Sequence, residues 1–241
     1  MYLWVIIATF LAALAAMGTS LRADIKQLYI EPQAENVITK IYTQHRSMLT
    51  YAYKHLRNSD GTTDISQGQW KPEDHPGYVP YGFQPNSGTS SFTSKIYCLD
   101  RNSGQHSAVP TTDCYNVAAP GEEPVMNCCT APTAVIYLVT YGNIPARWRD
   151  LKTGKPRPEL MNAMKTTLGF IDGFGYVVNK TTDNPNLGEN NKYDTLGTNY
   201  GISCQGLRSY FSIPQYVIND GDFKDTCLKA NNYCLIYMST I

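Results

Sequence analysis

The first part of the chain is apolar almost without interruption. Residues 2–21 carry no charged side chain, and of the first seventeen residues only Thr9 falls outside the apolar set. Twenty helical residues extend about 30 Å, which matches the hydrocarbon core of a bilayer. Trp4 lies near one end, where its ring suits the headgroup region. The pattern predicts a membrane-spanning helix over Tyr2–Leu21.

Two other interpretations of this stretch stay open. A secretory signal peptide has a basic segment before a shorter apolar core, and no Lys or Arg precedes this one, although Ala13 and Ala15 could form a cleavage site. The other interpretation is a buried core helix, although an apolar helix without polar residues would be unusual at the extreme terminus. A membrane anchor agrees best with its length and composition.

A helical pattern continues behind the apolar stretch, from residue 22 to residue 57. Apolar or long side chains recur at steps of three and four, and Glu35, Lys40 and Arg46 occupy the opposite face. Pro32 either kinks this helix or lies in the first turn of a new one. We expect the apolar stripe to pack on a sheet formed by later residues. The positions of this face that we expect to contact a partner are Val37, Ile38, Ile41, His45, Met48, Leu49 and Leu56.

Shorter periodic segments fill the rest of the chain. Runs rich in Val, Ile, Tyr, Phe and Thr predict strands. These predicted strands are residues 91–99, 133–141, 174–178, 210–213, 216–218 and 232–238. Glu159 near the start and Gly169 beyond the end predict a short helix over residues 156–168. Its apolar face consists of Leu160, Ala163, Met164 and Leu168.

Together these elements predict an α+β protein. A transmembrane helix continues into a long amphipathic helix that packs on an antiparallel sheet, in a disulfide-stabilised, pilin-like arrangement. The expected division is a membrane anchor at residues 1–21, an amphipathic helix at 22–57 and an extracytoplasmic α+β domain at 58–241. Residues 60–132 are rich in Gly, Pro, Ser and Thr, and we expect small strands and disulfides to hold them.

The cysteines provide the main evidence on compartment. There are seven, and all are candidates for disulfides: Cys98, Cys114, Cys128, Cys129, Cys204, Cys227 and Cys234. None forms a C-x-x-C pair, which argues against thioredoxin chemistry and a ribbon-type zinc site. Their number in turn-rich segments favours an oxidising compartment. Because seven is odd, at least one thiol is free or bridges to another chain, and spacing does not assign the pairs.

The charges next to the apolar stretch favour the opposite orientation. Arg22, Lys26 and Lys40 follow it and no basic residue precedes it, so the positive-inside rule places them in the cytoplasm. Long domains can translocate despite such charges. We give the cysteines more weight and place residues 22–241 outside the cytoplasm.

Composition and charge narrow the function classes. Charged residues make up 17% of the chain, against about 25% in ordinary soluble domains. Twenty basic residues balance twenty acidic ones, so the overall charge does not favour nucleic-acid binding. A basic cluster lies at Arg147, Arg149, Lys152, Lys155 and Arg157. Without a glycine-rich phosphate loop, we interpret it as a solvated turn.

The histidines do not form a recognisable catalytic or metal motif. The four lie at positions 45, 55, 75 and 106, too scattered for a zinc signature. His45 lies on the apolar face of the predicted helix, where a structural role is the better interpretation. His75 and His106 lie near Asp74 and Asp113, but without a nucleophile elbow. We therefore expect no catalytic residue, no cofactor and no metal ion.

The order of these elements resembles bacterial type IV pilus proteins, and in more detail the PilM family of the type IVb (thin) pilus systems. The resemblance rests on residues 1–17, on residues 34–37 through 51–53, and on residues 137–141, 156–168 and 173–177. It implies a role in pilus assembly and no catalytic residues. The first glycine is Gly18 and the first acidic residue is Asp24, which argues against a prepilin in the strict sense.

We therefore expect a membrane-tethered structural component of type IV pilus assembly or of a related secretion apparatus, which acts through protein–protein contacts. Its expected location is the bacterial inner membrane, held by Tyr2–Leu21 in a single pass, with most of the chain in the periplasm. The expected partners are other pilus or secretion proteins, with a homo-oligomer possible and no nucleic acid. One alternative is a minor pilin or adhesin whose aromatic residues Tyr78, Tyr81 and Phe83 stack on sugars. The other is a secreted hydrolase with a site near His75, His106 or a free cysteine.

Overall fold

The computed structural model describes residues 2–25, 31–56, 65–85, 91–100, 134–150, 152–169, 171–179, 200–203, 210–229 and 233–241. The helices are α1 (Tyr2–Ile25), α2 (Glu31–His55), α3 (Pro158–Leu168), α5 (Gln215–Asn219) and α6 (Gly221–Cys227). The strands are β1 (Gly68–Trp70), β2 (Thr93–Asp100), β3 (Ala134–Asn143), β4 (Phe174–Asn179), β5 (Tyr200–Ser203), β6 (Tyr210–Ser212) and β7 (Cys234–Thr240). Short 3-10 helices, η2 (Pro72–Asp74), η3 (Pro76–Tyr78) and η7 (Ala146–Trp148), lie in the connections.

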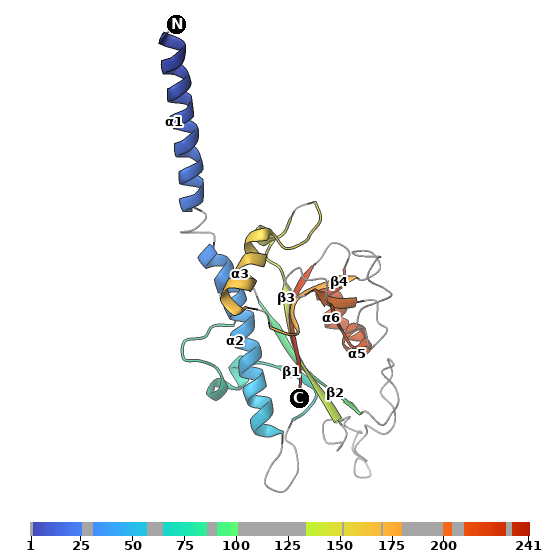
Figure 1. The fold of residues 1–241 in the computed structure, drawn as a ribbon. Coiled ribbons are helices and arrows are strands. Elements are labelled where there is room, and N and C mark those ends of the chain that lie inside the picture. Colours follow the sequence, from blue (N-terminus) through green and yellow to red (C-terminus); the bar gives the residue numbers. More distant parts are fainter. Residues whose placement is uncertain are drawn as a thin grey trace, which may run out of the picture.

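The strands form one antiparallel sheet in the order β1-β2-β3-β7-β4-β5-β6. The last strand, β7, lies between β3 and β4 near the middle of the sheet (Figure 1). Thr140 of β3 lies opposite Ser94 of β2 on one side and Tyr237 of β7 on the other. This register brings three distant parts of the chain next to one another.

Helices cover both faces of the sheet. In Figure 1, α2 and α3 lie on one side and α5 and α6 on the other. Side chains alternate between the faces along each strand. On β3, Leu138 packs under α2, whereas Val139 and Tyr141 pack against α5 and α6. The sheet is therefore apolar on both sides, which explains why its central strands are continuous apolar runs.

The apolar stripe of α2 packs on this sheet. Pro32 lies in the first turn of α2, so it begins a new helix and does not kink a longer one. The first half of the stripe packs against α3, and the second half packs over β1, β2 and β3. The buried stripe residues are Ala34, Val37, Ile38, Ile41, His45, Met48 and Ala52.

This packing changes the interpretation of the expected partner-contact face. Five of its positions, Val37, Ile38, Ile41, His45 and Met48, are buried within the chain. The other two, Leu49 and Leu56, are half-buried at the edge of the same core. The sheet and α3 supply the apolar surface that the stripe requires, so the stripe is not a free face for a partner.

The first helix departs from expectation. α1 continues beyond Leu21, through Arg22 and Asp24, and ends at Ile25. Across the described ranges, no helix combines the length and the apolar character that crossing a membrane requires. The predicted membrane-spanning helix, and that part of the expected fold class, is therefore wrong. The protein is α+β, with an antiparallel sheet and a disulfide.

Most of the shorter elements are found where the patterns predicted them. Five predicted strands are confirmed as β2, β3, β4, β6 and β7, with ends shifted by up to two residues, and the predicted helix is confirmed as α3. The strand predicted at residues 216–218 is wrong, because these residues lie in α5. Pro214 caps its first turn, and Val217 and Ile218 are buried under the sheet. Three apolar residues are too few to distinguish a period of 2 from one of 3.6.

Candidate functional site

A buried polar network joins α2 to the middle of the sheet. The His45 side chain has no exposed surface. Its Nδ1 lies 3.1 Å from Thr140 Oγ1 of β3, and its Nε2 lies 2.8 Å from Ser239 Oγ of β7. The imidazole also stacks on the Tyr237 ring, with the ring centroids 3.8 Å apart. One side chain of α2 therefore contacts two neighbouring strands.

The network continues through Gln44. Its amide donates to Ser94 Oγ at 3.0 Å and to the carbonyl oxygen of Phe92 at 2.9 Å. Ser94 Oγ in turn lies 2.8 Å from Thr140 Oγ1. The buried hydroxyls and the imidazole are thus hydrogen-bonded to one another, as buried polar groups must be to avoid a desolvation cost.

The Ser239–His45 pair has the hydrogen-bond geometry of a nucleophile and its base, but its surroundings suit a structural role. Burial lowers the pKa of His45 to about 3, and the charge of Arg46 acts in the same direction. A general base works best when its pKa lies near the operating pH. A neutral imidazole donates from one ring nitrogen and accepts at the other, which suits a hydroxyl on each side. The network therefore holds α2 in register on β3 and β7.

A group of aromatic and imidazole rings lies where the C-terminal end of α2 meets residues 70–78. We call it the aromatic surface, and it consists of Tyr51, His55, Trp70, His75 and Tyr78. Tyr51 lies at its centre, with ring centroids 4.5 Å from His55 and 4.4 Å from His75. Trp70 and His75 stack almost in parallel, 5.4 Å apart. His55 Nε2 lies 2.8 Å from the Tyr78 hydroxyl, which connects the helix to η3.

The aromatic surface is layered from the core outward. Trp70 is only 3% exposed and forms its floor, and among the described residues its indole N–H has no hydrogen-bond partner. The other four rings are half-exposed, and the Lys54 ammonium lies 5.2 Å from the Tyr78 ring centroid. Tyr81, in the turn after Tyr78, is fully exposed. Rings with polar tips at such depths can accept both apolar contacts and hydrogen bonds from a partner.

Part of this surface was expected from the sequence. Tyr78, Tyr81 and Phe83 had been singled out for stacking, and His75 as a candidate for chemistry; of these, the structure places His75 and Tyr78 in the aromatic surface. Tyr51 and His55 were missed, although their spacing of four residues on a predicted helix puts them side by side. The residues around Trp70 do not predict that it lies beneath the other rings, because its position depends on how β1 pairs with β2.

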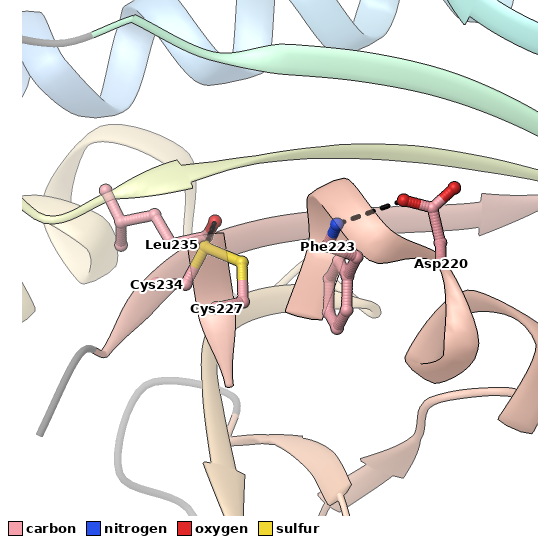
Figure 2. The surroundings of a disulfide bond; sticks show 5 residues. All are labelled: Asp220, Phe223, Cys227, Cys234 and Leu235. Atoms are coloured by element: carbon pink, nitrogen blue, oxygen red, sulfur yellow. Dashed lines mark hydrogen bonds between the residues drawn. A yellow bond between two sulfur atoms is a disulfide. The ribbon is translucent and has the colours of Figure 1, made fainter. Parts of the chain in front are cut away.

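A second polar cluster lies on the opposite face of the sheet. The Lys95 ammonium lies 3.0 Å from both carboxylate oxygens of Asp220 and 2.7 Å from Asp222. Although burial alone lowers the pKa of Lys95, its hydrogen bonds to Asp222 and Asp220 raise it overall. Figure 2 shows that Asp220 also caps α6 by accepting from the Phe223 N–H. The group thus fixes the junction of α5 and α6 against β2.

A disulfide lies at the other end of α6. Cys227, the last residue of α6, is bonded to Cys234, the first residue of β7, with the Cα atoms 4.9 Å apart (Figure 2). Cys98 is also disulfide-bonded. The other candidate cysteines, Cys114, Cys128, Cys129 and Cys204, lie outside the described residues, as do His106 and Asp113. The bridge ties the helical cover of this face to a central strand.

The described histidines do not form a metal site. Within the ranges that the structure describes, no group of three His, Cys, Asp or Glu side chains could hold a metal ion. His55 and His75 both contact Tyr51, and their rings are engaged by other aromatic side chains. These two histidines are therefore part of the packing of the aromatic surface.

Comparison with known proteins adds no family assignment. No protein-family model, no curated protein and no solved structure matches this chain. The function has to be inferred from the residues of the chain itself.

Proposed function

We propose that this protein is a structural component of an extracytoplasmic assembly, of the kind built by type IV pilus and related secretion systems. It acts through protein–protein contacts made by the aromatic surface together with Tyr81, the exposed ring in the turn after Tyr78. The polar network of His45 holds α2 on the sheet, and α2 in turn presents Tyr51 and His55 to a partner. A rigid base reduces the ordering cost of binding, because fewer side chains lose freedom when the partner binds.

The observation that carries this proposal is the set of four half-exposed rings packed over the buried Trp70, together with the fully exposed Tyr81 in the turn that follows. Aromatic residues are enriched in protein interfaces and are over-represented among the residues that contribute most of the binding energy. The location outside the cytoplasm is supported by the disulfide of Cys227 with Cys234 and by the disulfide-bonded Cys98. We place the folded domain in the periplasm of a bacterium.

The experiment compares two exposed tyrosines. Tyr81→Ala should reduce the amount of pilus or secretion proteins that co-purify after crosslinking by about tenfold, as expected for an aromatic interface anchor. Its thermal stability should not change, because the ring is fully exposed. Co-purification is measured by quantitative mass spectrometry of crosslinked cells.

Tyr53→Ala is the matched control. Tyr53 is 60% exposed, but it lies two residues from both Tyr51 and His55 and so points about 200° away from them around α2. This variant should retain its partners. Equal recovery of the same partners with Tyr81→Ala and with wild type would contradict the proposal, as would normal pili or secretion in a deletion strain.

A second candidate function is that of a minor pilin or adhesin. It is favoured by the full exposure of Tyr81, because an exposed ring can stack on a sugar. A glycan array probed with wild type and Tyr81→Ala distinguishes the two functions. Binding of a glycan that is lost in the variant, without any co-purifying apparatus protein, would favour the adhesin.

A further inference from the structure

The segment that follows β3 forms a closed turn. Arg149 and Pro156 pair as an isolated antiparallel bridge. The Asp150 N–H donates to the carbonyl oxygen of Lys155, and the Arg157 N–H donates to that of Trp148, each at 2.8 Å. We call residues 147–150 and 152–157 the basic hairpin. The basic cluster noted in the sequence therefore lies on an ordered turn.

The charge of the basic hairpin is strongly one-sided. It carries five basic residues and one acidic residue, in a chain whose twenty basic and twenty acidic residues otherwise balance. The basic residues are Arg147, Arg149, Lys152, Lys155 and Arg157, of which the first, third and fifth are exposed and the other two half-exposed. Such a concentration of positive charge attracts anionic partners within about one Debye length, roughly 8 Å in physiological salt.

The one acidic side chain shapes the turn. Asp150 Oδ1 accepts hydrogen bonds from the Lys152 N–H, the Thr153 N–H and the Thr153 hydroxyl, at 2.8 to 3.0 Å. The bonds from Thr153 and Lys152 hold the pKa of Asp150 below its usual value. Asp150 is thus engaged with the backbone at the tip, and Arg157 Nε also donates to the carbonyl oxygen of Arg149 at 3.1 Å.

The position of the basic hairpin indicates what it contacts. Arg147 Nη1 donates to Gln33 Oε1 at 2.9 Å, which places the hairpin beside the first turn of α2. α1 ends at Ile25 and α2 begins at Glu31, and six peptide steps cover at most about 22 Å. Figure 1 shows α1 leaving from this end of α2, next to α3. The hairpin therefore lies at the end of the domain nearest to α1.

α1 itself is strongly apolar. Its large apolar side chains are exposed, among them Trp4, Phe10, Leu11 and Met17. Exposed apolar side chains together with Lys and Arg are the combination that binds the surface of an anionic lipid layer. An acidic protein would account for the basic charge but not for the exposed apolar side chains of α1, the helix that precedes α2 in the chain.

We propose that the basic hairpin is a contact site for the anionic headgroups of a lipid surface. The contact is electrostatic and takes place at the headgroups. Each Lys or Arg held near such a surface strengthens binding by about fivefold. The proposal goes beyond the function proposed above and involves the opposite end of α2, so the two can fail independently.

Lysine footprinting on the full-length chain tests this contact directly. The protein is mixed with vesicles of phosphatidylcholine alone or with about one third phosphatidylglycerol, and the vesicle-associated fraction is acetylated and analysed by mass spectrometry. Lys152 and Lys155 should become at least fivefold less reactive on the anionic vesicles only, and 0.5 M salt should restore their reactivity, because salt screens the attraction. Lys71 and Lys224, exposed on other parts of the surface, should react equally on both vesicles.

A charge-matched pair of variants completes the test. Lys152→Gln combined with Arg157→Gln should reduce the protection of Lys155 to within twofold of its value on neutral vesicles. Lys71→Gln combined with Lys224→Gln removes the same charge and should leave that protection unchanged. Equal reactivity of Lys155 on the two kinds of vesicle, or equal protection in both double variants, would overturn the proposal.

Discussion

The two ends of α2 present different chemistry to their surroundings. In its first turn, Gln33 accepts a hydrogen bond from Arg147 of the basic hairpin. Near its last turn, Tyr51 and His55 form part of the aromatic surface. From Gln33 to His55 the helix rises about 33 Å, so the two regions lie far apart on one rigid element. A single helix, fixed in its middle by His45, can therefore orient two separate contact regions.

The two regions also differ in how they connect to the core. The aromatic surface rests on Trp70, which packs with Met48, Ile96 and Leu138. The basic hairpin is anchored at its base by the buried Trp148, whereas its tip is shaped by backbone hydrogen bonds and by Asp150. One region is therefore an outward extension of the core, whereas the other is a charged turn on its edge. Substitutions at the two ends should consequently differ in their effect on folding.

The largest difference is expected between Trp70→Ala and Arg157→Gln. Removing the buried indole should lower the free energy of unfolding by about 3–5 kcal/mol, because it leaves a cavity beneath the aromatic surface. Replacing the exposed guanidinium should change it by no more than about 0.5 kcal/mol. Urea unfolding of both variants measures the difference. Similar losses in the two variants would show that the exposed Arg157 contributes to folding as much as the buried Trp70, and that the two regions do not differ in this respect.

His45, in the middle of α2, should make the free energy of unfolding depend on pH. The pKa of His45 is about 3 in the folded protein and about 6.5 in the unfolded chain, so only the unfolded chain binds a proton between these values. The contribution of His45 to the free energy of unfolding is therefore fully present above about pH 6.5, and it is lost as the pH decreases toward 3. From pH 6.5 to pH 4.5 the loss should be about 2–3 kcal/mol, with a slope of at most about 1.4 kcal/mol per pH unit.

His45→Gln is the control for this prediction. The amide can still hydrogen-bond to a hydroxyl but does not titrate in this range. The pH dependence of its urea unfolding should be reduced by the amount attributed to His45, even if the variant is less stable overall. An unchanged slope would mean that other groups cause the acid sensitivity.

A smaller effect is expected on the α6 face. Replacing both Cys227 and Cys234 by Ser opens a loop with a sequence separation of seven residues. The chain-entropy model predicts a loss of about 2 kcal/mol. Hydrogen exchange should increase in α6 and remain slow in α2, because α2 packs on the other face of the sheet. Equally faster exchange in both helices would show that the two faces unfold together.

Local patterns were informative where an element is long enough to display its period. The amphipathic stripe of α2 extends over several turns, and its expected packing on a sheet is observed. β3 is ten residues long and was the clearest predicted strand. Short segments were less certain. Residues 216–218 carry strand-forming residues but belong to a helix of five residues, because Pro214 and the buried surface beneath them determine the local structure.

The candidate contact regions could be predicted only in part. The basic residues of the hairpin are close in sequence, so their cluster was visible, but the ordered turn that presents them depends on bonds made by Asp150. Tyr78 was anticipated, whereas Trp70 was not, since strand pairing positions it beneath the other rings. The long apolar run at the start of the chain was interpreted too strongly, as a membrane-spanning helix.

By itself, the sequence determined which positions of α2 and of the central strands face a core, because hydrophobic periodicity along a helix or strand is a local property. Only the tertiary structure decided which polar groups meet. His45 bonds to Thr140 and Ser239, 95 and 194 residues away, and Lys95 bonds to Asp220, 125 residues away. These contacts depend on the order and register of the strands, which are set by the simultaneous packing of all elements and by no single segment.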